Sequence, residues 1–109
     1  MQGALDGLEK TYFTLQTQID MLGAGCQTQE QRDALTRQYV LSRQNYWGCV
    51  NKAFHDEDPE VAKLTSQIEA GNQQLANSVE QMGDISKTID TVTNVVTMGT
   101  ALAGKVITG

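Results

Sequence analysis

An apolar heptad repeat runs from residue 61 to residue 106 without a change of register. Its positions lie alternately three and four residues apart, the spacing of the buried seam of a coiled-coil helix. They are Val61, Leu64, Ile68, Gly71, Leu75, Ser78, Met82, Ile85, Ile89, Val92, Val96, Gly99, Ala103 and Val106. A register kept over this distance favours one long helix, up to ~70 Å at ~1.5 Å per residue. We therefore predict a continuous helix over residues 59–106.

One alternative competes with this long helix. The pair Gly83 and Asp84 could end one helix and cap the next, which would give an up-down four-helix bundle. A turn between two helices usually resets the register of the apolar positions, whereas Met82 and Ile85 stay in phase across this pair. We therefore favour the continuous helix and keep the bundle with a break at Gly83-Asp84 as the alternative.

Two further helices precede the long one. Residues 4–22 repeat the three-four spacing, and the run Gly23-Ala24-Gly25 then supplies a stop. The second helix is predicted over residues 29–54, because Thr28 and Gln31 have the spacing of a capping box. Its apolar face is wide, as expected of a helix that packs against two neighbours. The fold class is all-α: an antiparallel N-terminal hairpin packed on a long C-terminal coiled-coil helix, within a single domain of residues 1–109.

Three tyrosine and tryptophan residues of the second helix surround an arginine. Tyr39, Tyr46 and Trp47, with Arg43 between them, could form a ligand-facing patch. The chain has few aromatic residues, and aromatic residues at helical spacing in such a chain more often form the core. We therefore expect these side chains to be core residues.

The segment that leads into the third helix is acidic. Residues 55–60 hold the only histidine, His55, and four carboxylates. Asp58 has the residue type of an N-cap and Pro59 that of a first helical residue. The spacing lacks the alternating oxygen ligands, central glycine and distal glutamate of a calcium loop. We interpret the segment as a solvated turn and helix cap, with no metal site.

The net charge of the chain and the absence of known catalytic motifs disfavour nucleic-acid binding and enzymatic activity. The net charge of −5 leaves no basic footprint for phosphates, so we expect no nucleic-acid partner. The chain contains no glycine-rich phosphate loop, no His-Glu-x-x-His motif and no paired Cys-x-x-Cys. His55 follows Cys49 by six residues, and side chains six residues apart on a helix point to different sides of it. This geometry disfavours a catalytic Cys–His pair. We expect a non-enzymatic protein with no catalytic residue, cofactor or metal.

Cys26 and Cys49 are the two cysteines. If residues 29–49 form one straight helix, the two thiols lie ~30 Å apart along it, whereas a disulfide needs α-carbons within about 7 Å. We expect free thiols; the alternatives are a bridge between two chains, or a bend near Gly48 that would allow a bridge within one chain.

The C-terminal segment 91–109 carries a single charge, Lys105, and several small residues. Its five threonines, Asn94 and three glycines make it a poor membrane span. Small residues let a second helix approach closely. We therefore favour helix packing for this segment, with membrane contact as the less favoured interpretation.

These expectations lead to a function of protein interaction. A hairpin of ~25-residue arms cannot cover a helix nearly twice as long, so the seam beyond residue 86 would lack a cover within the chain. We expect a coiled-coil interaction or assembly subunit that binds itself, as a homo-oligomer, or another helical protein. The predicted partner-binding residues are Ile85, Ile89, Val92, Val96, Gly99 and Leu102. The alternatives are a small helical inhibitor, immunity protein or secretion chaperone that uses the second-helix aromatics and the acidic turn, and a secreted, translocator-like membrane-active protein.

Overall fold

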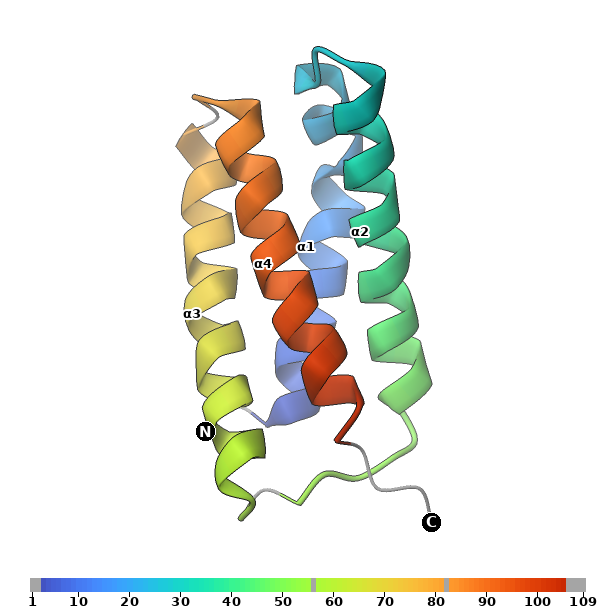
Figure 1. Ribbon diagram of the computed structural model, residues 1–109, viewed down its shortest axis with the longest axis vertical. Helices are drawn as coiled ribbons and strands as arrows, with labels where there is room; N and C mark the ends of the chain where they lie inside the picture. The colour runs from blue at the N-terminus through green and yellow to red at the C-terminus, as the bar shows by residue number, and fades with distance from the viewer. Residues whose placement is uncertain (1–2, 56, 82, 106–109) are drawn as a thin grey trace.

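The computed structural model describes residues 3–55, 57–81 and 83–105, and its helices are α1 (Ala4–Gly25), α2 (Gln29–Cys49), α3 (Pro59–Gln81) and α4 (Ile85–Ala103). In Figure 1, α1 and α3 run upward and α2 and α4 run downward, so the helices form an up-down-up-down bundle. The bundle is elongated, with extents of 43 × 21 × 18 Å. The predicted all-α class is confirmed, and the observed arrangement is the four-helix alternative.

The prediction of one long helix over residues 59–106 is wrong. Helix α3 ends at Gln81 and α4 begins at Ile85, after Asp84 accepts a 2.9 Å hydrogen bond from the backbone N–H of Ser86. The heptad positions Ser78, Met82 and Ile85 keep their four- and three-residue spacing in the sequence, although the chain reverses between α3 and α4. Register continuity therefore did not exclude a turn here. The predicted end at residue 106 lies outside the described residues.

The order of the helices around the bundle differs from their order in the chain. Helix α1 packs beside α2 and α3, and α4 packs beside α2 and α3 as well. The described parts of α2 and α3 make no contact, so these two helices occupy opposite corners. The described residues between them, 50–55 and 57–58, cross the lower end of the bundle (Figure 1). The outer surface therefore includes one α1–α2 face that the other hairpin does not cover.

The predicted helix starts are confirmed at atomic detail. Thr28 accepts a hydrogen bond from the N–H of Gln31 at 3.1 Å, and the Gln31 side chain accepts one from the N–H of Thr28 at 3.2 Å. Asp58 accepts a 2.9 Å bond from the N–H of Glu60, ahead of Pro59. Two predicted helix ends are wrong. Helix α1 continues through Gly25 instead of stopping after residue 22, and helix α2 ends at Cys49 instead of residue 54, because the chain after it turns across the bundle end.

The core combines apolar stripes with a few buried polar bridges. The largest fully buried side chains are Leu8, Leu15, Leu22, Ile68, Leu75, Leu102, Val61, Val92, Val95 and Val96. Buried Asn72 of α3 accepts a 2.6 Å hydrogen bond from Thr11 of α1 and donates a 3.1 Å bond to the carbonyl of Gly7. Asn45 of α2 donates a 3.1 Å bond to Thr100 of α4. These bonds tie the α1–α2 hairpin to the α3–α4 hairpin and satisfy polar groups that would be costly to bury alone.

Candidate protein-interaction surface

The residues predicted to bind a partner lie mostly in the core of this chain. Val92, Val96 and Leu102 are at most 1% exposed, Ile89 and Gly99 are buried, and Ile85 is half-buried. The expectation that this seam is uncovered is wrong, because the break before α4 folds the seam back onto the other three helices. The folded chain therefore does not present this seam to a partner.

The two cysteines are free thiols in this structure, and both are buried. Cys26 lies just before α2 and Cys49 is the last residue of α2, so they sit near opposite ends of the bundle. Burial raises the pKa of the Cys49 thiol, so the reactive thiolate is disfavoured there. Cys26 donates a hydrogen bond to the carbonyl of Leu22 at 3.4 Å. Both cysteines behave as small core side chains.

The described part of the chain offers neither a metal-binding cluster nor a membrane-spanning helix. Residues 3–55, 57–81 and 83–105 hold no group of three or more His, Cys, Asp or Glu side chains placed to bind a metal ion. Within the same ranges, none of the helices has the length and apolarity to cross a membrane. In the acidic turn, exposed His55 lies 3.1 Å from the carboxylate of Glu57, and Asp58 caps α3. Asp56 lies outside the described residues.

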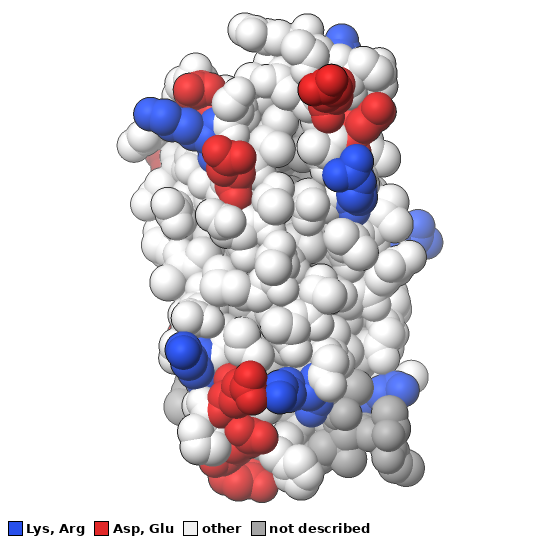
Figure 2. Space-filling model, in the orientation of Figure 1, with Lys and Arg blue, Asp and Glu red and all other residues white. Residues whose placement is uncertain are grey.

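The face formed by α3, α4 and part of α2 carries few charges over its middle. Figure 2 shows charged side chains gathered toward the two ends of the bundle, with an uncharged band between them. No acidic or basic residue occurs from Thr91 to Gly104 or between Glu69 and Glu80. The exposed side chains of this band are threonine, asparagine, glutamine and alanine, such as Asn77 and Thr97. Such side chains are readily hydrated, and no large apolar group stands out among them.

Large apolar side chains are exposed on the other hairpin. Those that the described residues leave exposed are Phe13 (42%), Met21 (42%), Val40 (43%) and Trp47 (54%), all from α1 or α2. The expectation that Trp47 is a core residue is therefore wrong, while Tyr46 is buried as expected. Trp47 is the only tryptophan of the chain, and indole is costly to leave in water.

A cluster of stacked rings supports this exposed surface. The ring of Tyr12 lies 5.9 Å from the rings of both Tyr39 and Tyr46, where α1 packs on α2. The ring of Phe13 lies 5.8 Å from that of Tyr46, and Trp47 packs edge-on to Tyr46 at 5.1 Å. These centroid separations are in the favourable range for aromatic pairs. The exposed rings therefore rest on a fixed, mostly buried base.

The hydroxyl group of Tyr46 links the two helices at the same place. It donates a 3.0 Å hydrogen bond to Oε2 of Glu9. The bond to Glu9, together with burial and the charge of that carboxylate, raises the pKa of Tyr46. Tyr46 therefore stays protonated at neutral pH and keeps the side chain of Glu9 at the surface between α1 and α2.

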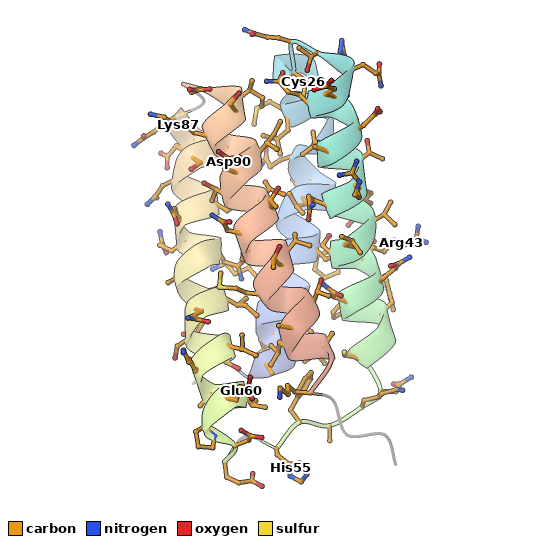
Figure 3. The ribbon with its side chains drawn as sticks, viewed as in Figure 1. Cys26, Arg43, His55, Glu60, Lys87 and Asp90 are labelled. Atoms are coloured by element: carbon orange, nitrogen blue, oxygen red, sulfur yellow. The ribbon has the colours of Figure 1, made fainter. Side chains whose placement is uncertain are left out.

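Two short stripes of residues define the outer surface of this hairpin. The α1 stripe is Glu9, Phe13, Gln16 and Asp20, and the α2 stripe is Thr36, Val40, Arg43 and Trp47. Each has four-three-four spacing, so its members share one side of their helix. All are exposed except Glu9, which is half-buried. Figure 3 shows Arg43 pointing away from the bundle. We call the two stripes together the α1–α2 face.

The α2 half of this face is hollowed. Val40, Arg43, Gln44 and Trp47 line a shallow open groove on the outside of α2. The side chains of Trp47 and Arg43 are both among those that line it. Such a groove can receive one apolar side chain of a partner beside the cation of Arg43.

Comparison with protein-family models, with curated proteins and with solved structures finds no match for this chain. The sequence contains one indication of the α1–α2 face: Glu9, Phe13, Gln16 and Asp20 form a second stripe on α1, outside the buried one. This outer stripe was overlooked because the buried stripe of the same helix is more apolar.

Proposed function

We propose that this chain is a non-enzymatic protein-interaction module that binds its partner through the α1–α2 face. The observation that carries the proposal is the exposure of Trp47, more than half of which faces solvent. It shares a groove with exposed Val40, and exposed Phe13 packs on the other side of Tyr46. Soluble proteins keep contiguous apolar surface small unless another molecule covers it. Tryptophan, tyrosine and arginine are also the residues that contribute most binding energy at protein interfaces.

The rigidity of the face supports the same function. Its side chains come from two packed helices. The ring of Phe13 packs against Tyr12 and Tyr46, and the ring of Trp47 packs against Tyr46. A surface held in place before binding loses little conformational entropy when a partner docks. The charged groups at its edges, Glu9, Asp20 and Arg43, would select partners with complementary charge.

This proposal keeps the interaction role expected from the sequence and moves it to another surface. The partner is a second copy of the chain or another protein, and the contact is made by α1 and α2. Residues of the α4 seam, such as Val92 and Val96, are needed for folding because they lie in the core. A loss of binding after their substitution would therefore reflect a loss of structure.

Site-specific photo-cross-linking tests the proposed function. A photoreactive phenylalanine analogue in place of Phe13, in cells that produce the chain, should form covalent adducts with a protein partner. The same analogue in place of Asn77, exposed on α3, should form few. Combining the Phe13 probe with Trp47→Ala should reduce the adducts at least about fivefold, because hot-spot truncations commonly cost more than about 1 kcal/mol. Equal labelling from positions 13 and 77 would refute the proposal.

A further inference from the structure

The two halves of the α1–α2 face differ in shape and in charge. The α1 stripe exposes the ring of Phe13, which is 42% exposed, and carries two carboxylates, Glu9 and Asp20. The α2 stripe is hollowed between Val40 and Trp47 and carries the cation of Arg43. One half therefore offers an exposed ring and negative charge, and the other offers a groove and positive charge.

The two stripes also lie at matching heights along the bundle. The Glu9–Tyr46 hydrogen bond and the stacking of Tyr12 between Tyr39 and Tyr46 fix how α1 passes antiparallel to α2. This register places Phe13 about level with Arg43, in the middle of the groove. Both stripes have the same four-three-four spacing, so Glu9 lies level with Trp47, and Asp20 with Thr36.

From this juxtaposition we infer that the partner of the α1–α2 face is a second copy of this chain, related by a twofold axis parallel to the helices. The inference rests on the proposed function and names its partner. A twofold axis in that direction lays α1 of one copy over α2 of the other and leaves every height unchanged. A contact of this kind requires a surface that is complementary to itself, and the two halves of this face meet that requirement.

The contacts that follow are specific. Phe13 of each copy enters the groove of the other, where it meets the groove-lining side chains of Val40 and Trp47. The guanidinium of Arg43 then lies over the ring of the opposing Phe13, within one helical turn of the opposing Glu9. Two such sites form in one dimer, so each favourable contact occurs twice.

Charge disfavours the other twofold arrangement. An axis perpendicular to the helices would lay α1 on α1 and α2 on α2. Glu9 of one copy would then face Asp20 of the other, Arg43 would approach Arg43, and both grooves would stay empty. Like charges placed opposite each other are unfavourable in a contact. The shape and charge of this face therefore favour the twofold axis that is parallel to the helices.

Sedimentation of the purified full chain tests whether the second copy binds. The mass should rise from that of one chain toward that of two as the concentration increases through the micromolar range. Arg43→Glu should weaken this association at least about tenfold. Arg37→Glu is the matched control, because Arg37 is an exposed arginine of α2 outside the α2 stripe, and it should change the association less than about threefold. A parent that remains a single chain at millimolar concentration would overturn the inference.

Cross-linking tests the register. Asp20→Cys and Thr36→Cys lie at the edge of the face and leave its rings intact, while the native cysteines are buried. In a mixture of the two variants, a short thiol cross-linker should join residue 20 of one chain to residue 36 of the other. The perpendicular axis would invert the heights and place residue 20 opposite residue 9, and residue 36 opposite residue 47. A dimer in which residues 20 and 36 do not become linked would therefore overturn the inference. A single-chain parent whose Phe13 probe still captures a different protein would refute the second copy and leave the proposed function standing.

Discussion

Replacing Val96 with glutamate should unfold this protein and should not simply dissociate an assembly. Val96 is 1% exposed and lies among Leu8, Val95 and Gly99 near the middle of the bundle. The described residues around it include no cation, so an ionised carboxylate would lack a partner there. A buried charge without a partner is among the most damaging substitutions, with an expected loss of more than about 3 kcal/mol in the free energy of unfolding.

Thr97→Glu is the matched control for this substitution. Thr97 is the next residue of α4 and is exposed, so its free energy of unfolding should change by no more than about 0.5 kcal/mol. Urea denaturation followed by circular dichroism measures both variants. Burial would raise the pKa of the carboxyl group introduced by Val96→Glu, so the defect should shrink as pH falls below neutrality. A folded Val96→Glu protein whose only change is a smaller mass would mean that the seam is exposed.

Replacing Gly71 with leucine should destabilise the bundle by at least about 2 kcal/mol. A β-carbon at position 71 would lie 2.9 Å from Cγ2 and 3.1 Å from Cβ of Val95, so α3 and α4 would have to move apart. Forcing extra methylene groups into a packed core typically costs ~1–3 kcal/mol, and here the nearest atoms belong to a branched side chain close to the backbone. Thermal or urea denaturation measures the loss.

Alanine substitutions at two glycines distinguish the effect of packing from that of helix propensity, because the free energy of unfolding should change in opposite directions. Gly48→Ala in α2 meets no neighbouring atom within 4 Å and should stabilise the protein by up to ~1 kcal/mol, since alanine favours helix over glycine. Gly71→Ala should destabilise it, because the contact with Val95 outweighs the same gain. Equal stabilisation by both alanine variants would contradict the close approach of α3 to α4.

The helix caps and the apolar stripe of the first helix could be predicted from the sequence, because they depend on neighbouring residues. The Thr28 capping box, the Asp58-Pro59 helix start and the apolar stripe of the first helix all appear where they were expected, because each depends on residues within one or two turns. The all-α class follows from the same signals. The prediction failed where two local interpretations were nearly balanced: at residues 82–84 a glycine and a capping aspartate compete with an unbroken heptad.

The choice between one long helix and two shorter ones also determined which residues were predicted to bind a partner. With one long helix, the stripe from Ile89 to Leu102 would face solvent, whereas in the hairpin the same stripe meets α1 and α2. The exposure of Trp47 depends on which helices become neighbours of α2, and that order is a property of the whole bundle. Since α3 occupies the opposite corner, the side of α2 that bears Trp47 has no helix to cover it. No pattern within residues 29–54 carries this information.

The chain folds back between the end of α3 at Gln81 and the start of α4 at Ile85, which hides the α4 seam and leaves the α1–α2 face open. Carbodiimide cross-linking between Glu60 and Lys105 tests it most directly. In the structure, Nζ of Lys105 lies 2.8 Å from Oε2 of Glu60, whereas a continuous helix would separate the two residues by ~68 Å at ~1.5 Å per residue. We predict a Glu60–Lys105 link in protein that runs as a single chain. A link found only between two chains, or none at all, would contradict the fold and the interaction surface that depends on it.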